Sequence, residues 1–401
     1  MSTPEICRSP NCRGSEAMTI TMQPSTAEDV RECVLNTLEA KDTVEIRGGG
    51  TKAGFGKPVQ PARILDMRGL SGIVDYDPPE LVLTVLPGTP LTDVRAALNE
   101  LGQALAFDPF DHGPVYGMDE GAATIGGVVA AGVAGSQRLT SGSARDHLLG
   151  FKAVSGRGEA FVGGAKVVKN VTGYDLPKIM AGSWGRLAVL TELTLKVLPK
   201  PPERLTLALR DLPDDRAVAV MARALGSPAE VAAAAHVIGD PEVGTVTLLR
   251  LQGVRPSVAA RALQLEALLG LEGEVQRLPE PLAARLWKEV TNVTALGTGP
   301  LWRISVPPTA GPAIARRVRE MGGRYLLDWG GGLVCAVVEG ESATLRTAAR
   351  EAGGHATLVR ADPALRAETP AFHPAPVGVA ALEERVRRSF DPQGIFETGR
   401  F

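Results

Sequence analysis

The chain has 401 residues, enough for two or three domains, and 44% of them are hydrophobic. Its 43 Lys and Arg residues nearly balance its 45 Asp and Glu residues, so the formal net charge is -2. Without a basic excess, the chain is a poor candidate for nucleic-acid binding. The sequence has neither a secretory signal nor an apolar run of about twenty residues, so we expect a cytoplasmic protein. Any membrane contact should be peripheral, on the inner face of the cell membrane.

Residues 1–18 carry small and polar side chains without a helical or strand period. We therefore expect residues 1–24 to form a disordered leader, with the natural start at Met18. The four cysteines form no CxxC pair and no pair spaced from a histidine as in zinc sites. We predict no metal site.

A helix followed by a strand opens the folded part of the chain. Residues 25–28, Ser-Thr-Ala-Glu, fit a capping box, and apolar residues then recur on one helical face. A strand at 43–47 leads into the glycine-rich loop 48–56. The next elements are expected to be strands at 64–67, 73–77 and 81–86 and a helix at 90–101.

Small residues dominate the segment 123–135, which we expect to begin a helix capped by Thr124. A proline cluster at 199–202 marks the predicted domain boundary. Between them we expect a hairpin at 148–162, a short helix at 173–181 and a long alternating strand at 187–198.

Residues 204–278 and 301–359 share one order of elements: strand, helix, strand, strand, helix, strand. This order predicts two ferredoxin-like βαββαβ units, linked by a helix at 282–292. A last helix is expected at 379–389. The first unit is predicted as strands at 205–210, 231–237, 245–251 and 274–278 with helices at 214–224 and 256–269. The second unit is predicted as strands at 301–306, 324–328, 333–338 and 355–359 with helices at 310–321 and 341–352.

Three glycine-rich loops lie within one predicted domain, at 48–56, 87–88 and 124–142. Glycine lets a ligand approach the main chain closely, and such loops can direct several N–H groups at an anion. The sequence has no GxxxxGK[ST] P-loop and no GxGxxG after the first strand of a βαβ unit. A single glycine loop is more often a simple turn. Several loops that each follow a strand favour a cofactor with two phosphates and a long aromatic ring.

The order of these motifs resembles a known flavoprotein superfamily. The chain is similar to the FAD-binding domain of the vanillyl-alcohol-oxidase/PCMH superfamily in RGGGTK at 47–52, VLPGTPL at 85–91, ATIGG at 123–127, GSARDHLLG at 142–150 and AVLTELTLKVLPKP at 188–201. The runs 163–201 and 373–401, the second ending in FDPQGIFETGRF, resemble the FAD-binding E subunits of bacterial glycolate oxidases in particular. The resemblance covers about residues 25–401.

The resemblance and the repeated pattern together predict an α+β fold. A PCMH-type FAD-binding domain would occupy 25–200, and an α/β cap with two ferredoxin-like (βαββαβ) units would occupy 201–370. Residues 371–401 would return to the FAD-binding domain. FAD would lie between the domains and be bound non-covalently, because the first glycine loop holds no His or Cys for a covalent link.

The resemblance also implies which residues contact FAD. Residues 48–52 would wrap the pyrophosphate with N–H groups, and residues 124–127 would add pyrophosphate and ribityl contacts. The turn 87–88 would border the cofactor, and the backbone around Val189 would meet adenine. The implied set is Arg47, Gly48, Gly49, Gly50, Thr51, Lys52, Pro87, Gly88, Thr124, Ile125, Gly126, Gly127, Ser143, Asp146 and Val189.

Oxidation of a 2-hydroxy acid on a flavin needs a cation for the carboxylate and a base for the hydroxyl proton. Catalytic 2-hydroxy-acid dehydrogenases of this superfamily carry a histidine-rich metal motif, which this sequence lacks, and we name no catalytic residue. His147 could face the flavin, but we favour a structural role in binding loop carbonyls. Arg145 and Lys169 could bind a carboxylate or phosphate or be solvated surface groups, and Tyr174 could lie near the flavin or in the core.

Three functions fit this sequence. In the first, which we favour, the chain is the FAD-binding subunit of a glycolate oxidase (glycolate dehydrogenase) complex that forms glyoxylate. A larger catalytic flavoprotein subunit and an iron–sulfur subunit would be its partners. In the second, the chain is a self-sufficient FAD-dependent dehydrogenase of another small 2-hydroxy acid. In the third, it is a flavin-free structural subunit. Two departures from the family motif favour this function: Arg186 replaces a small residue, and Ala188 places a methyl group where glycine lets the main chain come close.

Overall fold

The computed structural model describes residues 19–165, 174–340 and 342–401. The prediction of a disordered leader is wrong for its last residues, because Ile20–Met22 form strand β1. This strand pairs in parallel with β3 (Arg63–Asp66) and so belongs to the folded protein. The rest of that prediction, residues 1–18, lies outside the described residues.

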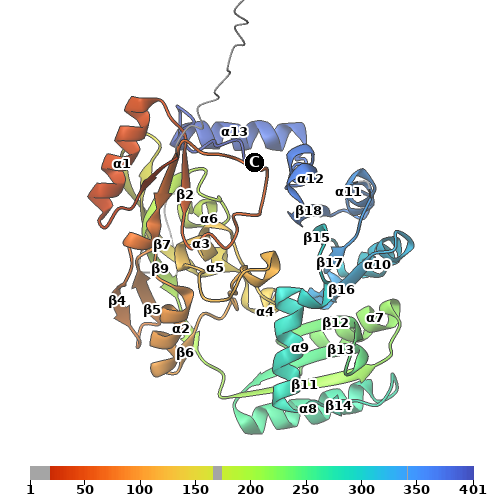
Figure 1. Ribbon diagram of the computed structural model, residues 1–401. Coiled ribbons are helices and arrows are strands. Elements are labelled where there is room, and N and C mark those ends of the chain that lie inside the picture. The colour runs from red at the N-terminus through yellow and green to blue at the C-terminus, as the bar shows by residue number, and fades with distance from the viewer. Residues whose placement is uncertain (1–18, 166–173, 341) are drawn as a thin grey trace, which may run out of the picture.

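The first lobe (residues 19–199) contains two principal sheets (Figure 1). A small parallel sheet has the order β1-β3-β2, and a five-stranded antiparallel sheet has the order β4-β5-β9-β7-β8. The other strands are β2 Val44–Arg47, β4 Ile73–Asp77, β5 Val82–Val85, β6 Gln103–Ala104, β7 Leu148–Ser155, β8 Ala160–Gly164, β9 Ala188–Lys196 and β10 Leu198–Pro199. The helices are α1 Ala27–Ala40, α2 Leu91–Glu100, α3 Ile125–Ala130, α4 Arg138–Ser141, α5 Ala144–His147 and α6 Leu176–Met180.

The capping box of α1 is shifted by one residue from the predicted one. The Asp29 N–H donates to the Thr26 hydroxyl at 3.1 Å, and the Thr26 N–H donates to the Asp29 carboxylate at 2.9 Å. The box therefore uses Thr26 and Asp29 rather than Ser25 and Glu28, and Ser25 adds a second donor to the same carboxylate. The buried face of α1 packs against β7, β9 and residues 395–396 near the chain end.

The second lobe (residues 203–360) contains one sheet of eight strands in the order β14-β11-β13-β12-β16-β17-β15-β18. Each half of this order is one ferredoxin-like unit, as predicted. The halves join where β12 pairs antiparallel with β16, with His236 opposite Leu327. The strands are β11 Glu203–Arg210, β12 Ala233–Asp240, β13 Gly244–Gly253, β14 Gln276–Arg277, β15 Leu301–Ser305, β16 Arg324–Asp328, β17 Leu333–Val337 and β18 His355–Arg360. The helices are α7 Asp214–Leu225, α8 Arg255–Leu269, α9 Glu280–Asn292, α10 Gly311–Glu320 and α11 Ser342–Glu351.

Helices cover the two faces of the eight-stranded sheet unequally. Helices α7, α8, α10 and α11 pack on one face, where Met221, Leu265 and Val318 are fully buried. Helix α9 packs on the other face through Leu286 and Trp287. This second face is the one turned toward the first lobe (Figure 1). It therefore supplies the side chains that can reach any site between the lobes.

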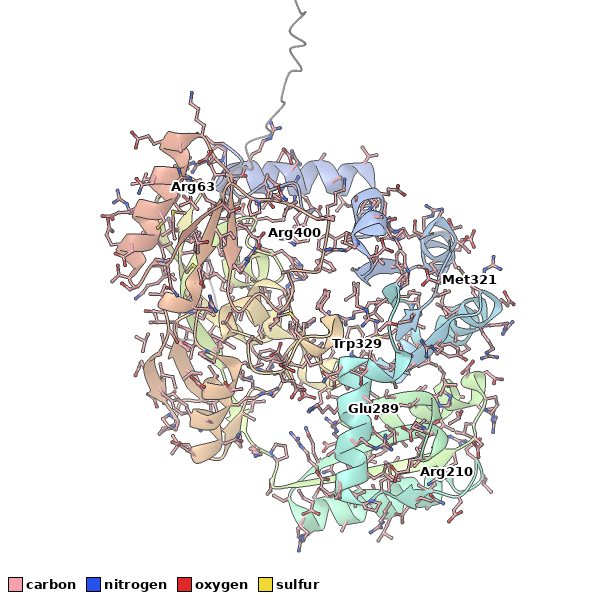
Figure 2. All side chains as sticks on the ribbon, in the orientation of Figure 1. Arg63, Arg210, Glu289, Met321, Trp329 and Arg400 are labelled. Atoms are coloured by element: carbon pink, nitrogen blue, oxygen red, sulfur yellow. The ribbon has the colours of Figure 1, made fainter. Side chains whose placement is uncertain are left out.

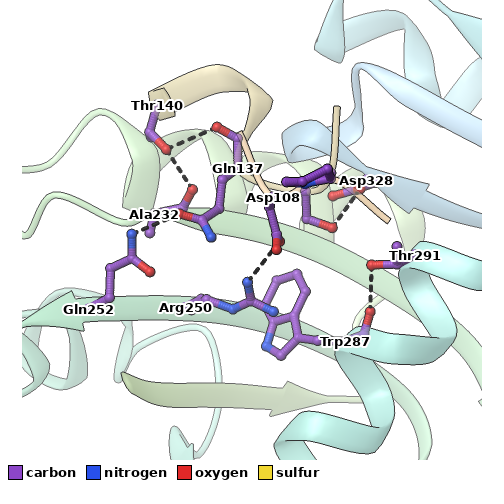
Figure 3. A network of polar contacts seen from close by, with 12 residues as sticks. Asp108, Gln137, Thr140, Ala232, Arg250, Gln252, Trp287, Thr291 and Asp328 are labelled. Atoms are coloured by element: carbon purple, nitrogen blue, oxygen red, sulfur yellow. Dashed lines mark hydrogen bonds and ion pairs between the residues drawn. The ribbon is translucent and has the colours of Figure 1, made fainter. Parts of the chain in front are cut away.

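Polar contacts join the lobes close to α4 (Figure 3). The Gln252 amide donates to Gln137 Oε1 at 2.7 Å. The Arg250 guanidinium lies 4.1 Å from the centre of the Trp287 ring and contacts Asp108 Oδ2 at 3.4 Å. Gln137 and Arg250 are buried, and Gln252 and Asp108 are half-buried, so the contacts Gln252–Gln137 and Arg250–Asp108 tie the two lobes together.

The chain returns to the first lobe after the second sheet. Helices α12 (Pro363–Glu368) and α13 (Val377–Phe390) lead it across the top of the molecule (Figure 1). The Ile395 carbonyl then accepts the Val44 N–H at 2.8 Å, which places the chain end beside β2. No helix in the described ranges is long and apolar enough to cross a membrane.

Truncating Leu327 tests the junction of the two ferredoxin-like units. Leu327 is 0% exposed where β12 meets β16, so Leu327→Ala is expected to lower the free energy of unfolding by about 2–5 kcal/mol. Leu271→Ala is the matched control, because Leu271 is 95% exposed. Urea unfolding followed by circular dichroism measures both variants, and equal midpoints would contradict the packing at this junction.

Candidate cofactor site

A cavity opens between the loop after β2 and the start of α3, and its space, together with the solvent at its open mouth, is about 1200 Å³. The turn 183–186, β9 and the chain end close its other sides. Loops that are far apart in the sequence thus share one cavity. The predicted contact residues that line it are Arg47, Gly48, Gly49, Gly50, Thr51, Lys52, Pro87, Thr124, Gly126 and Gly127.

The loop after β2 presents unpaired main-chain donors to this cavity. Within the described chain, the N–H groups of residues 49–52 have no hydrogen-bond acceptor. Gly50 has a φ of 73°, a left-handed conformation that suits glycine. Nearby, the Thr124 hydroxyl caps α3 by accepting the Gly127 N–H at 3.3 Å. Successive free N–H groups form an anion-binding concavity, so this wall of the cavity fits a phosphate.

The first glycines of the loop are required by contact between two protein segments. A Cβ on Gly49 would lie 1.4 Å from the Ala122 carbonyl oxygen. A Cβ on Gly48 would lie 2.2 Å from the Thr124 hydroxyl oxygen. Real Cβ atoms do not approach so closely, so only glycine allows the loop after β2 to touch the segment before α3.

Residues at the chain end line the cavity, although none was predicted as a contact. Arg186 donates from Nη2 to both carboxylate oxygens of Glu397, each at 3.1 Å. Arg400, labelled beside β2 in Figure 2, donates to the Ala53 carbonyl at 2.8 Å. The run FDPQGIFETGRF resembles the family and could have indicated these contacts. The sequence analysis used it only to predict that the chain end returns to the FAD-binding domain. The residues of this segment that line the cavity are Phe396, Glu397, Thr398, Arg400 and Phe401.

An aromatic wall formed by Trp184 and Phe401 lines one end of the cavity, and Phe55 and Phe372 pack against these two rings from outside the cavity. Trp184 stacks on Phe55, with ring centres 4.3 Å apart and planes inclined by 12°. Phe401 and Phe372 lie 5.5 and 6.1 Å from the Trp184 ring centre. Flat apolar surfaces of this kind favour contact with an aromatic ring system.

The charged side chains in the cavity wall are mostly cationic. Burial lowers the pKa of Lys52 to about 8, and nearby Asp111 opposes this shift. Among the described residues, no group of three His, Cys, Asp or Glu side chains could hold a metal ion. The cavity therefore fits an anionic organic ligand. The cations are Arg47, Lys52, Arg186 and Arg400, against the acids Glu45 and Glu397.

Five predicted contact residues lie outside the cavity wall: Gly88, Ile125, Ser143, Asp146 and Val189. Ile125 and Val189 are fully buried in apolar clusters. Asp146 accepts the Ser143 N–H at 2.8 Å and the Ser143 hydroxyl at 3.0 Å, which forms the capping box of α5. Contacts of these five residues with a cofactor stay predictions.

The sequence suggested four further candidates. His147 and Tyr174 could lie near the flavin, and Arg145 and Lys169 could bind a carboxylate or phosphate. His147 is buried and bonds the Ser141 carbonyl from Nε2 at 2.7 Å, which confirms the favoured structural role. Tyr174 is 88% exposed, so the prediction that it lies in the core is wrong. It does not line the cavity, and a position near the flavin stays a prediction. Arg145 is an exposed surface residue. Lys169 lies outside the described residues.

Comparisons with known proteins identify the class of protein that this fold and cavity define. A family model described as an FAD binding domain matches residues 18–164. The solved structure of p-cresol methylhydroxylase with substrate bound aligns with a TM-score of 0.69 and 16% identity, over 95% of this chain and 88% of that chain. Alkyldihydroxyacetonephosphate synthase aligns with a TM-score of 0.68 and 15% identity, over 94% and 75%. The chain therefore has the PCMH-type FAD-binding fold.

The sequence relatives narrow this class to a family. Glycolate oxidase subunit GlcE of Escherichia coli (strain K12) is 35% identical over 372 residues, which are 92% of this chain and 95% of that protein. Glycolate oxidase subunit GlcD of Bacillus subtilis (strain 168) is 29% identical, over 46% of this chain and 38% of that protein. Because the GlcE match spans nearly all of both chains, this chain belongs to the family of FAD-binding E subunits of glycolate oxidase.

Adding one methyl group to Gly49 tests the contact between the loops. Gly49→Ala would place its Cβ 1.4 Å from the Ala122 carbonyl oxygen, so we expect the loops to separate and most bound FAD to be lost. Gly378→Ala in α13 is the control, because no atom lies within 4 Å of a Cβ built there. The ratio of flavin to protein absorbance measures FAD content. Equal ratios in the two variants would exclude a role for this contact in cofactor binding.

Proposed function

We propose that this chain is the FAD-binding subunit of a glycolate oxidase complex, which oxidises glycolate to glyoxylate. The observation that carries the proposal is the match to GlcE along nearly the whole of both chains. The cationic cavity with its unpaired N–H groups supports it. A larger catalytic flavoprotein subunit and an iron–sulfur subunit would complete the complex in the cytoplasm, where the assembly would serve glyoxylate metabolism.

Different residues of the cavity would bind different parts of FAD. The N–H groups of residues 49–52 would hold the pyrophosphate, and Arg47 and Lys52 would balance its charge. The aromatic wall around Trp184 would support the flavin ring and exclude water from it. When bound, FAD supplies a two-electron acceptor that passes electrons on one at a time. None of the described residues that line the cavity is His, Cys or Tyr, which supports non-covalent binding.

We also propose a division of the chain into an FAD-binding domain at 25–200, a cap at 201–370 and a C-terminal segment at 371–401. The pairing of strands supports it, because the eight-stranded sheet uses only β11 to β18. The hydrogen bonds of Arg400 and Ile395 to the first lobe support the return of the last segment.

The absorbance spectrum of the purified chain tests the proposed function. With saturating FAD, we expect a bound flavin that stays oxidised when glycolate is added without oxygen, because electrons would arrive through the partner subunit. Denaturation with acid should release the flavin, since no covalent bond is expected. A chain that binds no FAD would contradict the proposal. Bleaching by glycolate alone would instead identify a self-sufficient dehydrogenase.

The lowered pKa of Lys52 predicts how FAD affinity depends on pH. Lys52 has a pKa of about 8, and bound pyrophosphate favours the charged ammonium, so binding of FAD should take up a proton. The Kd for FAD is expected to rise about tenfold from about pH 7 to about pH 9, as the protonated fraction of Lys52 falls. Lys52→Met should remove this dependence, whereas Lys57→Met, outside the cavity wall, should keep it. Quenching of FAD fluorescence measures the Kd, and parallel pH profiles for both variants would refute the assignment to Lys52.

A further inference from the structure

The first half of α13 and the segment before it are apolar and exposed. Residues 374–382 read PAPVGVAAL, and every one of them is exposed. Val377 is 88% exposed and Leu382 is 52% exposed. A Cβ built on Gly378 would have no atom within 4 Å, so the space beside this helical turn is open. A contiguous apolar surface of this kind typically marks a site where another molecule binds.

The start of α13 has little support from the rest of the chain. Pro376 occupies the N-cap position and offers no side-chain hydrogen bond to the first N–H groups of the helix. Glycine and β-branched valine, which fill residues 377–379, are poor helix formers. The second half of α13 packs on the core of the first lobe through Val386 and Phe390. Most helices in proteins are stabilised by packing of an apolar face, so a bound partner would stabilise the first half of α13.

Phe372 connects this exposed run to the cofactor cavity. Phe372 is 36% exposed and lies two residues before the run. Its ring centre is 6.1 Å from that of Trp184 and 5.3 Å from that of Phe401, and both of these residues line the cofactor cavity. The chain end also lies beside α13 (Figure 1), where Arg387 Nε is 3.2 Å from Glu397 Oε1. A molecule bound over Phe372 would therefore be separated from the cofactor cavity by one layer of aromatic rings.

The charges of α13 favour a protein over a membrane as the binding partner. A helix that binds an anionic lipid surface carries an excess of Lys and Arg next to its apolar face. Here Arg387 contacts Glu384 and Glu397, and Arg388 Nε lies 2.6 Å from Glu384 Oε1. The arginines of α13 and the glutamates in and beside it balance: Arg385, Arg387 and Arg388 against Glu383, Glu384 and Glu397. A neutral polar rim next to an apolar centre is typical of protein interfaces.

We propose that the surface formed by Phe372 and residues 374–382 is the docking site of the iron–sulfur subunit. The inference rests on the proposed function, in which this subunit receives electrons from the FAD of the present chain. An iron–sulfur centre takes up single electrons, which can cross a layer of side chains, so this subunit has to come close to the cofactor cavity without entering it. The layer of rings at Phe372, Trp184 and Phe401 meets that requirement.

Binding of the FAD-loaded chain to the purified iron–sulfur subunit tests this surface. Leu382→Glu puts a carboxylate into the apolar run and should raise the Kd at least about tenfold, because an unpaired charge would be buried at the interface. Leu263→Glu makes the same change on α8, where Leu263 is 61% exposed, and should bind like the unchanged chain. FAD content should be equal in all three proteins, since neither leucine lines the cofactor cavity. Biolayer interferometry measures the Kd.

A charge of opposite sign and amide hydrogen exchange separate the possible binding partners. Leu382→Lys should weaken binding of the subunit as Leu382→Glu does, whereas it would strengthen binding to phosphatidylglycerol vesicles if a membrane covered this surface. The iron–sulfur subunit should slow amide exchange in residues 377–383, which is expected to be fast in the chain by itself. Protection only by such vesicles, by the large flavoprotein subunit or by self-association would overturn the inference, as would equal binding by all variants.

Failure of this inference is distinguishable from failure of the proposed function. A chain that binds FAD but shows no effect of Leu382→Glu on its affinity for the iron–sulfur subunit would overturn the docking site and leave the proposed function standing. A chain that binds no FAD would contradict the proposed function. The affinity of that FAD-free chain for the iron–sulfur subunit, with and without Leu382→Glu, would still decide for or against this surface.

Discussion

The direct contact between the loop after β2 and the segment before α3 is the constraint on which the cofactor site depends. Gly49 lies directly against the main chain at Ala122, and Gly48 lies against the Thr124 hydroxyl. This contact brings the free N–H groups of residues 49–52 and the capped start of α3 to one cavity. The glycines therefore allow the two segments to pack together, and this packing in turn forms the cofactor cavity. The sequence analysis explained these glycines by the space that a ligand needs. The structure adds a stronger reason, because another main chain occupies the space that a Cβ on Gly49 would need.

The other side of the cavity depends on the end of the chain. The segment after α13 packs beside β2, where Glu397 bonds Arg186 and Arg400 bonds the loop after β2. Arg186 departs from the family motif, and its charge is used to hold Glu397 rather than left free. The cofactor site is thus complete only when the first and last folded segments of the chain are packed together. Binding of FAD and docking of the chain end should therefore stabilise each other.

The duplicated second lobe presents a continuous sheet to the first lobe. Because β12 and β16 pair at the junction, the two ferredoxin-like units share one sheet and turn the same face inward. That face carries Arg303 on β15, and the turn after β16 carries Trp329. Arg138 on α4 of the first lobe lies over the Trp329 ring, as Arg303 does. The cavity that these side chains line thus arises from the meeting of the lobes rather than from either one.

The sequence by itself determined most elements and the first glycine loop, because apolar periodicity and turn residues act over a few neighbouring positions. The strand at 324–328 has the predicted bounds, and the repeat of βαββαβ units is present. Short-range patterns could not select Thr26 over Ser25 as the cap or place Tyr174 at the surface. Only the tertiary structure brought the chain end and the turn at 183–186 into the cavity wall. Those segments meet through packing between parts of the chain that no local pattern connects.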